Sequence, residues 1–232
     1  MGSDTNAYNT ENHMGEMTEL TTSDGHKLAA YRAQPDGVPK AGLIVVQEIF
    51  GVTDHIQQVT DQFAGYGYLA IAPSLFDRVQ PGMVLGYTEF EKARATMQSL
   101  DLDDTVADMA AAAAGVRSAG KVGAVGYCWG GAIADLAACR IEIDAAVAYY
   151  GRMIVEWLDL KPDCPAMYHF GDKDQLIPSD MVEQIRGARP DGVFHTYPDA
   201  GHGFSCDERS DYHPESAGLA LTRTLEFLED TL

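Results

Sequence analysis

A cysteine between two glycines is the residue of this sequence best placed to act as a nucleophile. Cys128 lies in the segment 126–130 (Gly-Tyr-Cys-Trp-Gly), after the apolar run Val122–Tyr127 and before a helical stretch. In the pattern G-x-S-x-G the nucleophile occupies a sharp strand-to-helix turn, and here cysteine replaces serine. Glycines suit such a turn because they have no side chain where the chain bends and packs closely. The alternative is a small buried cysteine before an ordinary turn.

An acid and a histidine follow Cys128 in the order that accompanies this kind of nucleophile. Asp172 and Asp174 come after one strand candidate, and His202, with a glycine on either side, comes after the next. The carboxyl ends of parallel strands meet at one edge of a sheet, so these side chains can converge there. Either aspartate could supply the acid, and either could instead stabilise a turn.

The remaining histidines and cysteines give weaker signals. His169 and His195 lie inside strand candidates, which favours packed histidines, and the other histidines lack supporting context. The four cysteines show neither a C-x-x-C pair nor the spacing of zinc ligands, so we expect free thiols and no metal site. A thiol redox protein is a rival interpretation, since Cys206 could approach Cys128 through the fold.

Alternating strand and helix candidates predict an α/β fold, with a mostly parallel central sheet and helices on both faces. The strand candidates are short and mostly apolar: Lys27–Ala33, Leu43–Ile49, Tyr68–Ala72, Val122–Tyr127, Ala145–Tyr150, Ala166–Phe170 and Val193–Tyr197. The helix candidates lie between them: His55–Ala64, Glu89–Met97, Leu102–Ser118, Ala132–Cys139, Ser179–Gly187 and Ser216–Thr231. We expect a loop over Ser74–Gly86, one domain over 17–232, and a disordered or tag-like segment over 1–16.

Composition excludes several classes of function. The chain has a formal net charge of −19, which disfavours binding to nucleic acid or to an anionic membrane surface. The start lacks the apolar core of a secretory signal, and no apolar run is long enough to span a bilayer, so a cytoplasmic location is expected. An anionic substrate would need a cationic side chain close to the site.

Taken together, the motifs resemble those of the dienelactone hydrolase family over most of residues 27 to 230. The matching segments are 47–52 (Gln-Glu-Ile-Phe-Gly-Val), 72–73 (Ala-Pro) with Arg78 and 81–82 (Pro-Gly), 126–128 (Gly-Tyr-Cys) with 130–131 (Gly-Gly), 149–151 (Tyr-Tyr-Gly), Gly171 with Asp174 and Pro178, and 200–202 (Ala-Gly-His) with Phe204. As a set these segments are far more specific than any single motif.

The resemblance implies an α/β-hydrolase fold, no cofactor and a small-molecule ester or lactone substrate. It implies a triad of Cys128, His202 and Asp174, which favours Asp174 over Asp172. It also implies a second carboxylate, Glu48, that contacts the resting thiol and takes up its proton. The other implied site residues are an oxyanion hole from the backbone amides of Ile49 and Trp129, and substrate contacts from Arg78, Tyr149 and Phe50. The family's second substrate arginine corresponds to Cys206 here, which removes an expected positive charge.

A cysteine nucleophile points to an activated substrate. A thiolate, with a reference pKa of about 8.5, leaves a tetrahedral intermediate more readily than an alkoxide does. The intermediate formed from a simple alkyl ester would therefore tend to expel the thiolate and return to the ester. An enol ester or enol lactone expels an enolate that becomes a ketone, and it competes well with sulfur. We therefore expect an acyl-cysteine mechanism on such substrates. A general esterase or thioesterase and a non-catalytic binding protein of the same fold are the alternatives.

Overall fold

The computed structural model describes residues 15–232 and contains one eight-stranded sheet. Its spatial order is β1 (Glu16–Thr21), β2 (Lys27–Ala33), β4 (Leu69–Pro73), β3 (Gly42–Val46), β5 (Val122–Tyr127), β6 (Ala145–Tyr149), β7 (Ala166–Gly171) and β8 (Val193–Tyr197). The six strands β4, β3, β5, β6, β7 and β8 run parallel to one another, whereas β2 pairs antiparallel with both β1 and β4. The expected mostly parallel α/β fold is therefore confirmed.

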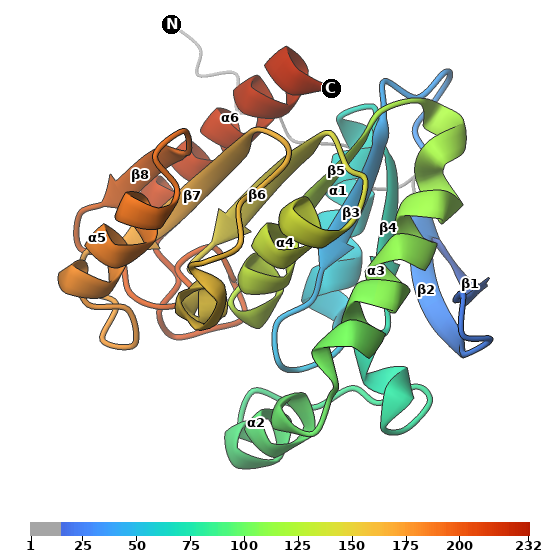
Figure 1. The fold of residues 1–232 in the computed structure, drawn as a ribbon, viewed down its shortest axis with the longest axis horizontal. Coiled ribbons are helices and arrows are strands. Elements are labelled where there is room, and N and C mark those ends of the chain that lie inside the picture. The colour runs from blue at the N-terminus through green and yellow to red at the C-terminus, as the bar shows by residue number, and fades with distance from the viewer. Residues whose placement is uncertain (1–14) are drawn as a thin grey trace, which may run out of the picture.

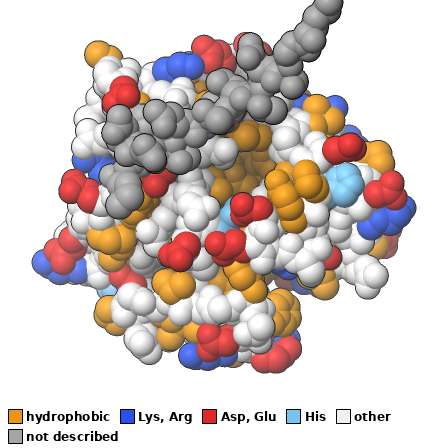
Figure 2. Space-filling model, turned by 180° about the vertical axis from the view of Figure 1, so that it is seen from behind, with side chains coloured by type: hydrophobic (Ala, Val, Ile, Leu, Met, Phe, Trp, Pro, Cys, Tyr) orange, Lys and Arg blue, Asp and Glu red, His pale blue; other side chains and the backbone are white. Residues whose placement is uncertain are grey.

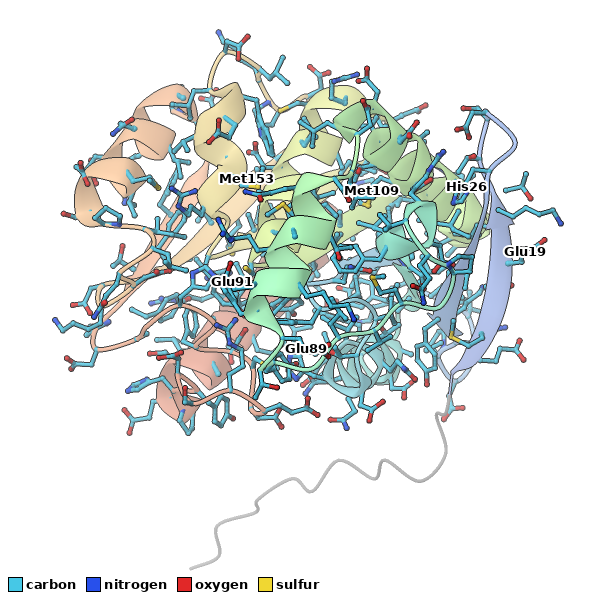
Figure 3. The ribbon with its side chains drawn as sticks, turned by 90° about the horizontal axis from the view of Figure 1, so that it is seen from below. Glu19, His26, Glu89, Glu91, Met109 and Met153 are labelled. Atoms are coloured by element: carbon cyan, nitrogen blue, oxygen red, sulfur yellow. The ribbon has the colours of Figure 1, made fainter. Side chains whose placement is uncertain are left out.

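Helices cover both faces of this sheet (Figure 1). On one face lie α1 (Asp54–Gly65) and α6 (Pro214–Thr231), and on the other lie α3 (Leu102–Val116), α4 (Trp129–Arg140) and α5 (Ser179–Ala188). The short helix α2 (Phe90–Gln98) stands apart from both layers at one end of the molecule, where Glu89 and Glu91 mark its start (Figure 3). Three 3₁₀ segments complete the described elements: η1 (Leu75–Arg78), η2 (Arg117–Ala119) and η3 (Arg152–Trp157).

The central strands are apolar throughout because both of their faces are covered. Every residue of β3, β5 and β6 is buried, and nearly all of α4 is buried against them. This rigid centre carries the turn at Cys128, because β5 leads into that residue and α4 follows it.

The structure differs from the sequence-based expectations mainly at the sheet edge and at strand ends. Strand β1 was not expected, and it begins at Glu16, inside the segment set aside as tag-like. It is an edge strand with mostly exposed side chains, so it lacks an apolar pattern, and pairing with β2 holds it in place. Residues 1–14 lie outside the described residues. The expected loop over Ser74–Gly86 contains η1, and β3 ends at Val46 instead of Ile49.

The charge of the chain is distributed over its surface. Figure 2 shows acidic side chains scattered across one face of the molecule, with Lys and Arg as isolated side chains among them. Within residues 15–232, no helix is both long and apolar enough to cross a membrane.

Candidate active site

Cys128 occupies a strained turn between β5 and α4. Its backbone has φ 55° and ψ −117°, a conformation that residues other than glycine rarely adopt. Neighbouring glycines make room for this turn: a Cβ at Gly126 would lie 1.9 Å from the Gly130 carbonyl oxygen, and one at Gly130 would lie 2.3 Å from the Gln47 carbonyl oxygen. The glycine pattern thus reflects close backbone packing, which presents Cys128 at the end of β5.

The three residues of the expected triad meet at this turn. The His202 Nε2 lies 3.1 Å from the Cys128 Sγ, and the His202 Nδ1 lies 2.7 Å from the Asp174 Oδ2. The other oxygen of Asp174 accepts hydrogen bonds from the backbone N–H groups of Leu176 and Ile177, so the carboxylate is fixed in orientation. His202 and Asp174 are both buried, while Cys128 is partly accessible. This is the geometry that a nucleophile, a base and an orienting acid require.

Asp172, the competing acid, has a structural role. It is exposed, and its Oδ1 accepts a hydrogen bond of 2.7 Å from the Asp199 backbone N–H. It therefore links the loop after β7 to the loop after β8, and no described hydrogen bond joins it to His202.

The environment of His202 favours the protonated imidazole. Burial by itself would lower the pKa of His202, but the Cys128 sulfur and the Asp174 carboxylate outweigh it and raise this pKa to about 10. The His202 imidazolium lies 3.1 Å from the Cys128 sulfur, and the N-terminal end of α4 begins directly after Cys128. The site thus places positive charge beside this sulfur at neutral pH.

The raised pKa of His202 predicts how alkylation of Cys128 depends on pH. Because the imidazolium persists up to the raised pKa of His202, wild-type Cys128 should be alkylated by iodoacetamide nearly as fast at pH 6.5 as at pH 8.5. In His202→Asn the sulfur loses this counter-charge, and an ordinary thiol is only about 1% ionised two pH units below its reference pKa. We expect its alkylation at pH 6.5 to slow roughly 100-fold.

Mass mapping of the alkylated peptides supplies the internal control. Burial raises the pKa of Cys139 and of Cys164 to about 12, so both thiols should stay unmodified in wild type and variant alike. Equal rates for Cys128 at pH 6.5 in the two proteins would contradict this effect of His202 on the sulfur.

Glu48 is buried beside the triad, but its described partner is an arginine instead of the thiol. Its Oε1 accepts a hydrogen bond of 2.9 Å from the Arg209 Nη1, and its Oε2 has no hydrogen-bond partner within residues 15–232. No hydrogen bond joins Glu48 to Cys128 among the described residues, in contrast to the expected contact with the resting thiol. The Cys128 sulfur is instead hydrogen-bonded to the His202 Nε2.

Arg209 was missed by the sequence analysis. The position expected to carry the second arginine holds Cys206, whose Sγ lies 3.4 Å from the Tyr87 hydroxyl oxygen. Arg209, three residues later, supplies the cation, and its guanidinium packs so closely on Gly203 that a Cβ there would lie 2.7 Å from its Cζ. The expected loss of positive charge is therefore wrong. The available signal was that Arg209 is the one cationic residue between His202 and His213.

Arg78, expected at the substrate, is instead paired with carboxylates of the protein. Its Nη1 lies 2.6 Å from Asp24, its Nη2 lies 2.8 Å from Asp108, and Asp104 lies 3.7 Å away. Only 12% of its side chain is exposed. This cluster gives Arg78 a structural role, because carboxylates of the protein already neutralise its charge.

Tyr149, also expected at the substrate, points toward α6. It is fully buried, and its hydroxyl shares a hydrogen bond of 2.6 Å with Thr224. The next residue, Tyr150, turns the other way at φ 39°, and its ring centroid lies 5.2 Å from that of His202. Its hydroxyl is 2.7 Å from the Ser205 Oγ. The conformation at the end of β6 thus selects Tyr150 as the tyrosine beside the triad.

The remaining expected site residues lie where the ends of β3 and β5 come together. Trp129 supplies the first amide of α4, and the first amides of a helix have no acceptor within it. The chain leading to Ile49 passes over this helix start, since the Gly130 Cβ position is 2.3 Å from the Gln47 carbonyl. Phe50 is buried, with its ring centroid 4.7 Å from that of Tyr87.

Comparisons with known proteins identify the family of the chain. The model of the dienelactone hydrolase family matches residues 28–232. The chain is 35% identical to a carboxymethylenebutenolidase of Pseudomonas putida, over 92% of this chain and 95% of the relative. It is 30% identical to carboxymethylenebutenolidase 1 of Cupriavidus pinatubonensis, over 93% of this chain and 97% of the relative.

A solved structure gives the same result. A Klebsiella pneumoniae protein provisionally described as a dienelactone hydrolase matches with a TM-score of 0.79 and 32% identity, covering 91% of this chain and 97% of that one. Family match, relatives and fold agree, and the resemblance in the sequence motifs is confirmed. The chain therefore belongs to the dienelactone hydrolase family and is a hydrolase of the ester or lactone type.

Proposed function

We propose that this hydrolase opens activated esters or enol lactones through a covalent acyl-cysteine intermediate. The observation that carries the proposal is the contact of the His202 Nε2 with the Cys128 Sγ, while the other ring nitrogen is held by Asp174. A nucleophile paired with a base, and a base oriented by an acid, is the arrangement that covalent acyl transfer requires.

In the first half of the reaction the Cys128 thiolate attacks the substrate carbonyl. The backbone amides of Trp129 and Ile49 are the proposed donors to the oxyanion that develops. The tetrahedral intermediate collapses to a thioester and expels the enolate, which becomes a ketone after protonation. A water molecule activated by neutral His202 then cleaves the thioester and regenerates Cys128.

Glu48 and Arg209 are proposed to couple substrate charge to this chemistry. A carboxylate on the substrate can pair with Arg209 in place of Glu48, since a guanidinium binds carboxylates well. Glu48 would then be left buried without its counter-charge, and such a carboxylate gains by taking a proton. The Cys128–His202 pair can donate this proton to Glu48, and its loss leaves a thiolate beside a neutral imidazole.

Glu48→Gln tests this coupling. The amide cannot take up the proton, so we expect acylation to slow at least about tenfold while the protein stays folded. The burst of product in stopped-flow measurements with an aryl ester that carries a carboxylate reports acylation directly, and thermal melting checks the fold. Wild-type burst rates in Glu48→Gln would remove Glu48 from the mechanism.

A hydrolysis screen over enol lactones, aryl esters, alkyl esters and thioesters tests the function as a whole. We expect enol lactones and aryl esters to be cleaved much faster than alkyl esters, because the leaving group must compete with the thiolate. The control is Cys128→Ala, which should cleave none of them. Alkyl esters cleaved as fast as enol lactones would overturn the proposed substrate class.

A further inference from the structure

The segment 203–213, here called the Arg209 loop, is folded mainly on its own backbone. Several backbone hydrogen bonds lie within it: the Cys206 N–H donates to the Gly203 carbonyl at 3.0 Å, and the Arg209 N–H donates to the Cys206 carbonyl at 3.1 Å. The His213 N–H donates to the Phe204 carbonyl at 2.9 Å. These bonds shape the loop but do not attach it to the sheet. Side chains must therefore determine where the loop, and Arg209 with it, lies relative to the triad.

Neighbouring side chains of the Arg209 loop each contact a different part of the fold. Residues 205–209 make four polar contacts: Ser205 to Tyr150 after β6 at 2.7 Å, Cys206 to Tyr87 before α2 at 3.4 Å, Asp207 to His55 on α1 at 3.0 Å, and Arg209 to Glu48 after β3 at 2.9 Å. Phe204, at the start of the loop, is buried against the rings of Tyr149, Tyr150 and Tyr197. The contact of Arg209 itself is the one that the proposed function uses. The other contacts are available to hold the loop in position.

The contact between Asp207 and His55 is the strongest candidate among them. His55 is the second residue of α1 and only 5% exposed, whereas the Asp207 side chain is 57% exposed and reaches inward to the Nδ1 of His55. A hydrogen bond from a fixed ring to a carboxylate is stronger than one between neutral groups. It also acts on a residue only two positions before Arg209.

We propose that His55 and Asp207 are positioning residues that hold the Arg209 loop on α1, so that the Arg209 guanidinium lies at the site to meet a carboxylate. This inference rests on the proposed function of Arg209 as the site's cation. Neither residue touches the reacting atoms, and both act through Arg209.

Electrostatics alone predicts the opposite effect for Asp207. Deleting a negative charge near the site should strengthen binding of an anionic substrate, because less repulsion remains. If Asp207 instead positions Arg209, deleting its side chain should weaken binding of that substrate. The sign of the change therefore separates the two roles.

The experiment compares kcat/KM for mono-4-nitrophenyl adipate and for its methyl ester, which share a leaving group and differ in one negative charge. We expect Asp207→Ala to lower the ratio of anionic to neutral kcat/KM by about tenfold, mostly through KM. His55→Phe should lower it similarly without removing a carboxylate. Asp207→Asn, which keeps an acceptor for His55, should stay within about twofold of wild type.

Two controls isolate the mechanism. Glu208→Ala removes the adjacent exposed carboxylate, which has no described side-chain partner, and should not lower the ratio. In an Arg209→Met background, adding Asp207→Ala should leave the ratio unchanged, because no guanidinium remains to be positioned. An unchanged or raised ratio in Asp207→Ala alone would overturn the proposal.

Hydrogen–deuterium exchange supplies a readout that does not depend on turnover. We expect amides of residues 203–213 to exchange at least about threefold faster in Asp207→Ala and His55→Phe, but not in Glu208→Ala. Equal exchange in all variants would overturn the proposal even if the wild-type enzyme cleaved neither ester. That lack of cleavage would count against the proposed function instead.

Discussion

Cys128→Ala should abolish hydrolysis of every ester and lactone that the wild-type enzyme cleaves, lowering kcat by at least about 10⁴-fold. The reason is that the His202 Nε2 lies 3.1 Å from the Cys128 sulfur, which is the atom that accepts the acyl group in the proposed mechanism. Initial rates with an aryl ester, together with intact mass after rapid acid quench, measure the loss of turnover and of the acyl adduct.

The matched control is Cys164→Ala. Cys164 is also partly buried, but burial raises the pKa of its thiol to about 12, and it makes no described contact with the triad. It should therefore keep wild-type kcat. Thermal melting of both variants excludes unfolding as the cause of any loss. If Cys128→Ala retained most of the activity, the cysteine mechanism would be wrong, whatever reaction the protein catalysed.

The second large effect is expected on stability, at a buried ion pair away from the triad. Arg189 binds Asp135 through two hydrogen bonds, from Nε at 3.0 Å and from Nη2 at 2.9 Å, and the two side chains are 1% and 0% exposed. Asp135 also accepts hydrogen bonds from the Tyr168 hydroxyl at 2.7 Å and the Trp157 indole N–H at 2.9 Å. One carboxylate thus joins α4 to β7, η3 and the end of α5.

Asp135→Ala should lower the free energy of unfolding by about 3–5 kcal/mol, because it leaves a buried guanidinium without its counter-charge. For a chain of this size that corresponds to a fall in Tm of roughly 6–20 °C. Differential scanning calorimetry provides the measurement. Replacing both partners, as Asp135→Leu with Arg189→Met, should recover part of the loss, but not all, since Tyr168 and Trp157 still lose their acceptor.

An exposed ion pair is the control for this prediction. Arg94 and Glu91 on α2 lie 2.9 Å apart with side chains 51% and 78% exposed, so Arg94→Met should change stability by less than about 1 kcal/mol. Equal Tm values for Asp135→Ala and Arg94→Met would show that burial of the Asp135–Arg189 pair does not increase the stability lost when the pair is broken.

Features fixed by short stretches of chain could be predicted from the sequence. The turn at Cys128 depends on glycines within a few residues of it, because an added Cβ at Gly126 or Gly130 would meet backbone atoms. Strand β5 is apolar throughout since helices cover both of its faces. His202 and the pair Asp172 and Asp174 could be placed because they lie a few residues after the ends of β8 and β7, and such strand ends share one edge. The choice of Asp174 over Asp172 came from the family resemblance.

Features that depend on how separate segments pack were decided only by the tertiary structure. The family resemblance pointed to Arg78 and Tyr149, yet three carboxylates from other elements bind Arg78, and Tyr149, at the end of β6, is hydrogen-bonded to Thr224. The proposed site cation is Arg209, which contacts Glu48 across 161 positions of sequence. The physical reason is that a backbone turn is governed by local sterics, whereas a charged side chain pairs with whichever opposite charge the folded chain brings within reach.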